Sequence, residues 1–188
     1  MLFHASLRQL LVRHRAWRLR LNGMTLAKPH WLAGGIDVRL GISPQGRGSI
    51  TMRENARLET GVVLHAYGGT IRLGRNLFVG PYTVIYGHGG VEIGDDCLIA
   101  MHCRIVSSNH AIPPFGADIQ GSPDELRPTK IGRDVWLGAG VTVLGGVTIA
   151  DGCIVGAGSV ITRDLPAGAI AYGAPAVIKS HREGSPRS

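Results

Sequence analysis

Aliphatic residues return at every sixth position along most of this chain of 188 residues. An α-helix with 3.6 residues per turn cannot stay in register with that period, and one long strand would alternate with a period of two. Short strands joined by sharp turns can keep a six-residue period, because three six-residue sides make one triangular coil. Such coils stack about 4.8 Å apart through parallel hydrogen bonds. The predicted inward positions are Met52, Leu58, Leu64, Leu73, Val79, Ile85, Ile93, Ile99, Ile105, Ile131, Leu137, Val143, Ile149, Val155 and Ile161.

A second series of mostly small or β-branched residues, four positions after the first, marks the predicted corners of the coils. Its members are Ala56, Val62, Gly68, Leu77, Thr83, Gly89, Cys97, Cys103, Asn109, Val135, Val141, Val147, Cys153, Ser159 and Leu165. The 28 glycines, with only three Phe, three Trp and four Tyr, agree with closely spaced turns and a core without large rings. The sequence therefore predicts an all-β fold, a parallel β-helix whose coils are stable only when stacked.

The longest interruption of the period predicts where the chain leaves this prism. Ile105 and Ile131 are 26 positions apart, which is six plus an insertion of 20 residues. The inserted loop is expected at 111–130, and long loops on rigid scaffolds often serve function. The expected organisation is an N-terminal arm at 1–34, the β-helix at 35–166 and a C-terminal tail at 167–188.

The N-terminal arm is basic and is predicted to be helical. Its basic residues Arg8, Arg13, Arg15, Arg18, Arg20 and Lys28 all precede Asp37, the first acidic residue. Of 20 basic residues, the other 14 face 13 acidic ones, so the body is almost neutral and no nucleic acid partner is expected. One helical face would carry Phe3, Leu7, Leu10, Leu11, His14, Trp17 and Leu21.

Two uses of that helix stay open at this point. It could pack on the prism or on a neighbouring subunit, or it could rest on an anionic membrane as a basic amphipathic helix. No stretch is long and apolar enough to span a bilayer, and arginines interrupt the apolar stretches that a signal peptide would need.

The cysteines indicate the cellular setting. Cys97, Cys103 and Cys153 are odd in number, lack CxxC spacing and fall on inward corners. Buried free thiols in a reducing, cytoplasmic location are therefore expected, at the inner face of the membrane if the arm binds lipid.

Several motifs follow one another in the second half of the chain. They are Ser107-Ser108-Asn109-His110, Ile131-Gly132-Arg133-Asp134-Val135-Trp136-Leu137-Gly138, Val155-Gly156-Ala157-Gly158-Ser159, Thr162-Arg163-Asp164-Leu165-Pro166 and Gly173-Ala174-Pro175-Ala176. In order and spacing, residues 93–175 resemble hexapeptide-repeat acetyltransferases of the maltose, galactoside and polysaccharide O-acetyltransferase type. The resemblance implies a left-handed β-helix, a homotrimer with active sites between subunits, and acetyl-CoA as the acyl donor.

The same resemblance implies individual roles. His110 would be the general base that takes the proton of the acceptor hydroxyl and later returns a proton to the departing thiolate. A backbone N–H in the coil after the insertion would stabilise the oxyanion. The implied acetyl-CoA contacts are Gly138, Ala139, Ala157 and Thr162 and, for the nucleotide phosphates, either Lys179 or Arg182.

The third sides of successive coils place Tyr67, His88 and Ser108 in one column near His110. This column is either an exposed polar surface without a role or an acceptor pocket. Galactoside-type enzymes carry an asparagine where this sequence has Gly80 and an aspartate where it has His88, so a different acceptor is expected. The expected acceptor is a sugar hydroxyl in a surface polysaccharide or its precursor, and the predicted contacts are Tyr67, Tyr86, His88, Ser108 and Asn109.

Three other functions stay open. One is acetylation of a streptogramin-type antibiotic, although those relatives carry a longer inserted loop. Another is a β-helix that only assembles, without catalysis. The last is a metal-dependent protein such as a γ-class carbonic anhydrase, but His88, His102 and His110 do not reproduce its histidine spacing, so no metal is expected.

Overall fold

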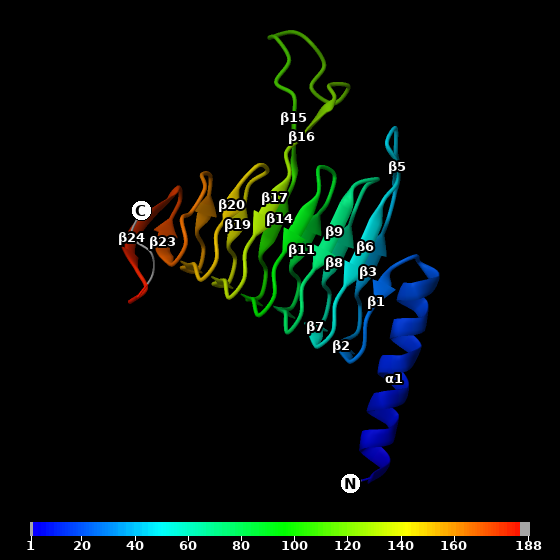
Figure 1. Ribbon diagram of the computed structural model, residues 1–188. Coiled ribbons are helices and arrows are strands. Elements are labelled where there is room, and N and C mark those ends of the chain that lie inside the picture. The colour runs from blue at the N-terminus through cyan, green and yellow to red at the C-terminus, as the bar shows by residue number, and fades with distance from the viewer. Residues whose placement is uncertain (1, 185–188) are drawn as a thin grey trace.

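The computed structural model describes residues 2–184, with side chains from residue 9 onward. After one helix, α1 (Leu2–Leu21), the chain winds into a left-handed parallel β-helix with three faces, each a sheet of short strands (Figure 1). The predicted all-β fold is confirmed. The predicted positions of the Phe3, Leu7 and Arg8 side chains fall outside the described residues.

Each full coil adds one strand to each of three sheets. Sheet A runs in the order β1 (Thr25–Leu26), β6 (Ser49–Met52), β9 (Thr70–Leu73), β12 (Val91–Ile93), β17 (Thr129–Ile131) and β20 (Thr148–Ile149). Sheet B runs in the order β2 (His30–Leu32), β7 (Ala56–Leu58), β10 (Phe78–Val79), β13 (Leu98–Ile99), β18 (Trp136–Leu137), β21 (Ile154–Val155), β23 (Ala169–Gly173) and β24 (Ala176–His181). Sheet C contains β3 (Asp37–Arg39), β8 (Val63–His65), β11 (Val84–Tyr86), β14 (Arg104–Val106), β19 (Thr142–Val143) and β22 (Val160–Ile161).

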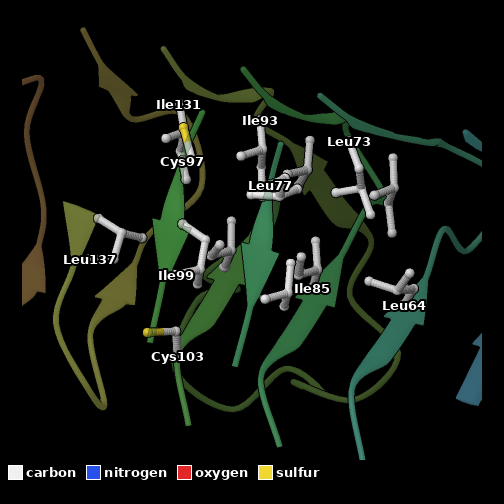
Figure 2. Close-up of a cluster of buried hydrophobic side chains, with 14 of the residues drawn as sticks. Leu64, Leu73, Leu77, Ile85, Ile93, Cys97, Ile99, Cys103, Ile131 and Leu137 are labelled. Carbon is white, nitrogen blue, oxygen red and sulfur yellow. The ribbon is translucent and has the colours of Figure 1, made fainter. Parts of the chain in front are cut away.

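The predicted inward positions form the core of the prism. Each of the fifteen aliphatic side chains is at most 2% exposed. Parallel pairing keeps them in layers, so that Ile85 pairs with Leu64 in one neighbouring coil and with Ile105 in the other. Figure 2 shows several of these side chains, with Cys97 and Cys103, pointing into the same interior. Burial of each aliphatic side chain contributes roughly 1.5–3 kcal/mol.

The insertion leaves the prism earlier than predicted. Ser107 is fully buried, but β15 (Ser108–His110) pairs antiparallel with β16 (Asp124–Leu126), so the chain departs as a hairpin (Figure 1). The prediction that Asn109 fills a corner is wrong, because Asn109 lies exposed in β15. The chain rejoins sheet A with β17, whose Thr129 is buried. A smaller antiparallel hairpin joins β4 (Ile42–Ser43) to β5 (Gly46–Arg47).

The helix α1 contacts the first coil, but not with the predicted face. Ala16 and Leu19 are buried there, whereas Leu10, Trp17 and Leu21 stay exposed. Two arginines fix the helix to the coil. Arg15 Nη1 donates to the carbonyl of Leu32 (2.9 Å), and Arg20 Nη2 donates to the carbonyl of Leu26 (3.1 Å). None of the described residues forms a helix with the length and hydropathy needed to cross a membrane.

Both ends of the prism lie outside the expected boundaries. β1 and β2 precede residue 35, yet they pair in parallel with β6 and β7, so the first coil starts at Thr25. At the other end, the expected tail contributes β23, which pairs with β21, and β24, which turns back antiparallel on β23. These terminal coils lack the full six-residue period. The sequence pattern therefore did not distinguish them from a linker or a tail.

Candidate active site

Ser107 fixes the point where the chain leaves the prism. Its Oγ donates to the Tyr86 carbonyl (2.8 Å) and accepts from the Gly89 N–H (3.1 Å). A Cβ at Gly89 would collide with the Ser107 carbonyl oxygen and would lie 2.7 Å from the Arg127 nitrogen. Glycine is therefore needed here, because both legs of the hairpin pass directly over the neighbouring coil.

The register of the hairpin places a carboxylate against His110. His110 in β15 pairs with Asp124 in β16, and Nδ1 of His110 lies 3.2 Å from Oδ1 of Asp124. The other carboxylate oxygen, Oδ2, lies 3.8 Å from Nε2 of His88. The His110 ring is 62% exposed, so its remaining nitrogen is accessible to a ligand. Asp124 was missed by sequence reasoning because nothing in the irregular insertion signalled the antiparallel pairing.

Four rings form a ladder on the outside of sheet C, beside this pair. This aromatic ladder consists of His65, Tyr67, Tyr86 and His88. The rings of Tyr67 and His88 stack with centroids 4.2 Å apart, and those of His65 and Tyr86 stack at 5.6 Å. Tyr67 meets Tyr86 edge to face at 5.2 Å. The predicted column of Tyr67 and His88 is therefore present, and Tyr86 joins it.

Within the ladder, His65 is held by a polar contact with Asp37. His65 is nearly buried, its Nε2 lies 2.8 Å from Oδ2 of Asp37, and its Nδ1 lies 3.2 Å from the Tyr67 hydroxyl. Burial alone would raise the pKa of Asp37, but the hydrogen bond and charge of His65, with Arg39, hold it below its usual value. Burial, together with Tyr86, raises the pKa of the Tyr67 hydroxyl. Sequence analysis overlooked His65, although it lies one coil from Tyr86 in the same register.

His88 is the member of the ladder that faces Asp124. Burial lowers the pKa of His88, and the neighbouring His110 lowers it further. The charge of Asp124 acts in the opposite direction and offsets only part of this lowering. Its Nδ1 is buried and has no hydrogen-bond partner among the described residues. A buried ring nitrogen without a hydrogen-bond partner is rare in folded proteins, so it marks His88 as a residue with a candidate role in the site.

The other predicted acceptor residues lie at the root of the hairpin. Ser108 is half-buried and pairs with Leu126, and Asn109 is exposed and pairs with Glu125. Their backbones belong to β15 beside His110. Their side chains form no hydrogen bond with the aromatic ladder, so the structure brings them near the site only through the strand.

The predicted acetyl-CoA residues lie at the two opposite corners that border sheet C, one where its strands begin and one where they end. Gly138, Ala139 and Ala157 belong to the turns that enter this sheet from sheet B. Thr162 follows the end of β22, at the opposite corner. His110 lies on this side as well, because β15 follows the end of β14. A single chain therefore does not bring the Ala139 and Ala157 corner together with His110.

The two predicted phosphate-binding cations have different surroundings. Nη1 of Arg182 lies 2.7 Å from Asp134 Oδ2 and 3.2 Å from the Gly152 carbonyl, at the edge between sheets A and B. Nζ of Lys179 lies 5.5 Å from the centre of the Tyr172 ring. Tyr172 packs against Gly156, next to Ala157, so Lys179 lies near the corner with the small residues.

The three cysteines are buried free thiols, as predicted. Burial raises the pKa of Cys97 to about 11 and raises the pKa of Cys103 and Cys153 as well. No cluster of three or more His, Cys, Asp or Glu side chains suited to a metal ion occurs within residues 9–184.

Two hexapeptide families match the sequence. The family described as bacterial transferase hexapeptide (six repeats) matches residues 128–163, and the hexapeptide repeat of succinyl-transferase matches residues 70–102. Both segments fall on coils of the prism.

Curated relatives extend the match to most of the chain. A protein named as a probable acetyltransferase of Mycobacterium tuberculosis is 34% identical over 90% of this chain and 57% of its own length. The galactoside O-acetyltransferase of Escherichia coli is 35% identical over 66% of this chain and 60% of its own length. A third relative, from Escherichia coli, carries the provisional name lipopolysaccharide biosynthesis O-acetyl transferase and is 36% identical over 70% and 71%. The chain thus spans somewhat under two thirds of the first two relatives.

Solved structures show the same architecture. A galactoside acetyltransferase in complex with coenzyme A superposes with a TM-score of 0.62, at 28% identity, over 79% of this chain and 65% of that one. A mutant of an N-acyltransferase from Bacillus cereus, AntD, superposes with a TM-score of 0.73 over 89% of both chains. At 21% identity the second likeness is one of fold alone.

Proposed function

Because the chain belongs to the hexapeptide-repeat acetyltransferase family, we propose that it transfers an acetyl group from acetyl-CoA to a sugar hydroxyl, with His110 as general base. The observation that carries this proposal is the pairing of His110 with Asp124 beside the aromatic ladder. Relatives named for O-acetylation of galactosides and for lipopolysaccharide biosynthesis support the reaction class.

The geometry of His110 suits a base that works through Nε2. With Nδ1–H donated to Asp124, Nε2 carries the lone pair and takes the hydroxyl proton as the acceptor oxygen attacks the thioester carbonyl carbon. When the carbon–sulfur bond breaks, the proton on Nε2 passes to the leaving sulfur. The base returns to its starting state, and Asp124 stabilises the imidazolium between the two transfers.

Direct transfer is supported by the state of the cysteines. A covalent acyl-enzyme would need a thiolate at neutral pH, but burial raises the pKa of all three thiols. Cys103 also donates to the Gly138 carbonyl inside the prism, away from His110. Three free thiols are in keeping with the reducing, cytoplasmic location that we propose.

We propose that a second copy of the chain completes the site. Ala139 and Ala157 lie at the corner where the strands of sheet C begin, and His110 lies beyond the corner where they end. One acetyl-CoA would therefore reach both only between neighbouring prisms. A small-residue corner lets a thin pantetheine arm approach the backbone. Lys179 is favoured over Arg182 for the phosphates, because Arg182 already binds Asp134 at another edge.

Sheet B carries a surface suited to subunit contact. Its outward positions, aligned by parallel pairing, are mostly apolar and form what we call the apolar stripe: Trp31, Phe78, Leu98, Trp136, Ile154 and Ile170. The equivalent positions of sheet A include Arg72, Glu92 and Lys130. A continuous row of partly or fully exposed apolar side chains is typical of a protein–protein contact, which supports the homotrimer of the proposal.

The test is an acceptor screen with purified protein. Acetyl transfer from acetyl-CoA to a panel of galactosides and polysaccharide sugars is followed by release of the CoA thiol and by mass spectrometry of the product. We expect acetylated sugar with the native protein and a rate about 10²–10⁴-fold lower with His110→Ala. Equal turnover by His110→Ala would refute the base, and absence of transfer to every sugar, with no stabilisation by acetyl-CoA, would favour a β-helix without catalysis.

A further inference from the structure

The described part of α1 has two apolar sides. Ala16 and Leu19 are buried against the first coil, whereas Leu10, Trp17 and Leu21 are 62%, 57% and 64% exposed. At 100° per residue the second group lies almost opposite the first. The helix therefore reaches the prism with one side and turns an apolar strip outward, which we call the outer strip: Leu10, Trp17 and Leu21.

Arginines border the outer strip on both sides. Arg13 and Arg20 follow one border and Arg15 and Arg18 the other, by the same helical geometry. Arg15 and Arg20 are held by carbonyl groups of the first coil. Arg13 and Arg18 are exposed, and the sequence has no acidic residue before Asp37. The outer strip is thus apolar, with only positive charge around it.

A cationic cavity lies where α1 meets the first coil. It has a volume of about 160 Å³ and is lined by residues that include His14, Arg15, Arg18 and Asn22. Its lining contains no acidic residue. Two guanidinium groups at one opening suit a phosphate group.

We propose that α1 seats the protein on a membrane surface that contains anionic phospholipids. The outer strip would lie at the acyl boundary, where a tryptophan ring is well placed, and the arginines would meet headgroup phosphates. A second copy of α1 is a poor occupant, because two such helices would bring their arginines together without an acidic partner. Charge complementarity thus selects the lipid surface.

The experiment measures binding of the whole protein to vesicles by co-sedimentation. Vesicles of phosphatidylcholine with a quarter phosphatidylglycerol are compared with pure phosphatidylcholine. We expect binding to the anionic vesicles alone, and weaker binding as salt is raised. Arg13→Gln with Arg18→Gln should reduce affinity about 30-fold, since each arginine near an anionic surface contributes roughly a fivefold effect. A blue shift of fluorescence on binding should disappear in Trp17→Phe.

A matched variant separates this effect from a change in net charge. Arg72→Gln with Arg104→Gln removes two exposed arginines from the prism and should leave vesicle binding unchanged. Equal binding to neutral vesicles, no binding at all, or equal losses in both double variants would overturn the proposal. So would dissociation of an oligomer by Trp17→Ser with Leu21→Ser, which would assign the outer strip to a second copy. All substituted side chains are exposed, so each variant is expected to fold.

Discussion

Asp124 is the residue on which the proposed chemistry of His110 depends most closely. Asp124→Asn keeps the size of the side chain but removes the charge that favours the imidazolium ion. We expect kcat/KM to fall at least about tenfold, yet less than for His110→Ala. Most of the fall should appear in kcat, with KM near its native value, because Asp124 acts through His110 and does not bind the acceptor.

This split between kcat and KM distinguishes a positioning residue from a structural one. Glu125→Gln is the control, since the carboxylate of Glu125 pairs with Arg127, which follows β16, and not with His110. A Glu125 variant with the same fall in kcat, or an Asp124→Asn variant in which only KM changes, would contradict the role given to Asp124.

His88 links stability to pH. Because burial lowers its pKa in the folded state, the unfolded chain binds more protons between the two pKa values, and stability rises with pH in that window. The free energy of unfolding should therefore be highest above about pH 6.5 and fall as the pH drops below it. Melting curves between pH 5 and pH 8 should show a smaller decline for His88→Gln than for the native protein.

A second histidine provides the comparison for His88. His102 is exposed at a corner of the prism, with its ring stacked on Tyr82. His102→Gln should keep the native pH dependence of the melting temperature. If both variants flatten the curve equally, the effect does not come from the buried position of His88.

Individual residues differ in how far the sequence alone could predict their positions. Inward residues such as Ile99 were predictable because burial imposes the six-residue period directly. The column of Tyr67 and His88 followed from that register. Asp124 could not be found, since its position depends on antiparallel pairing within an insertion that has no period. Asn109 was misplaced for the same reason, because the chain leaves the prism at Ser108.

The inserted hairpin is expected to be dispensable for the prism as an element. Ile112 and Phe115 are almost fully exposed, and no residue from 108 to 128 is buried. The Ala111 N–H donates to the Pro123 carbonyl (2.9 Å), so these residues already face each other. Replacing residues 112–122 by Asn-Gly, a two-residue hairpin turn, should leave the melting temperature within a few degrees.

A core substitution calibrates that measurement. Ile99→Ala removes a fully buried side chain and should cost about 2–5 kcal/mol of unfolding free energy. If the shortened hairpin were destabilised as much as Ile99→Ala, the tip would have to pack on the prism, contrary to its exposure.

The helix α1 shows what a sequence pattern leaves undecided about an element. The described members of the predicted apolar face are all exposed: Leu10, Leu11, His14, Trp17 and Leu21. The prism instead receives Ala16 and Leu19, which are too few to stand out in the sequence. A short contact of this kind depends on the shape of the first coil, which no periodicity encodes.

Assembly is the question at the scale of the whole molecule. Trp136→Glu places a charge in the middle of the apolar stripe, where a subunit contact would have to desolvate it. We expect light scattering to report a monomer, with loss of acetyl transfer because the site would be incomplete. Arg72→Glu, on the outward side of sheet A, should keep the native mass. A Trp136→Glu protein of native mass would exclude the stripe from the interface.

The two ends of the prism bear on whether β-helices of this kind can grow end to end. A stack of parallel coils has no intrinsic length, because each terminal coil offers free backbone groups on which another prism could grow. Here Arg15 and Arg20 occupy carbonyl groups of the first coil, and β24 runs against the direction that a further coil would require. Both features occupy or misalign backbone groups that end-to-end growth into a fibril would use.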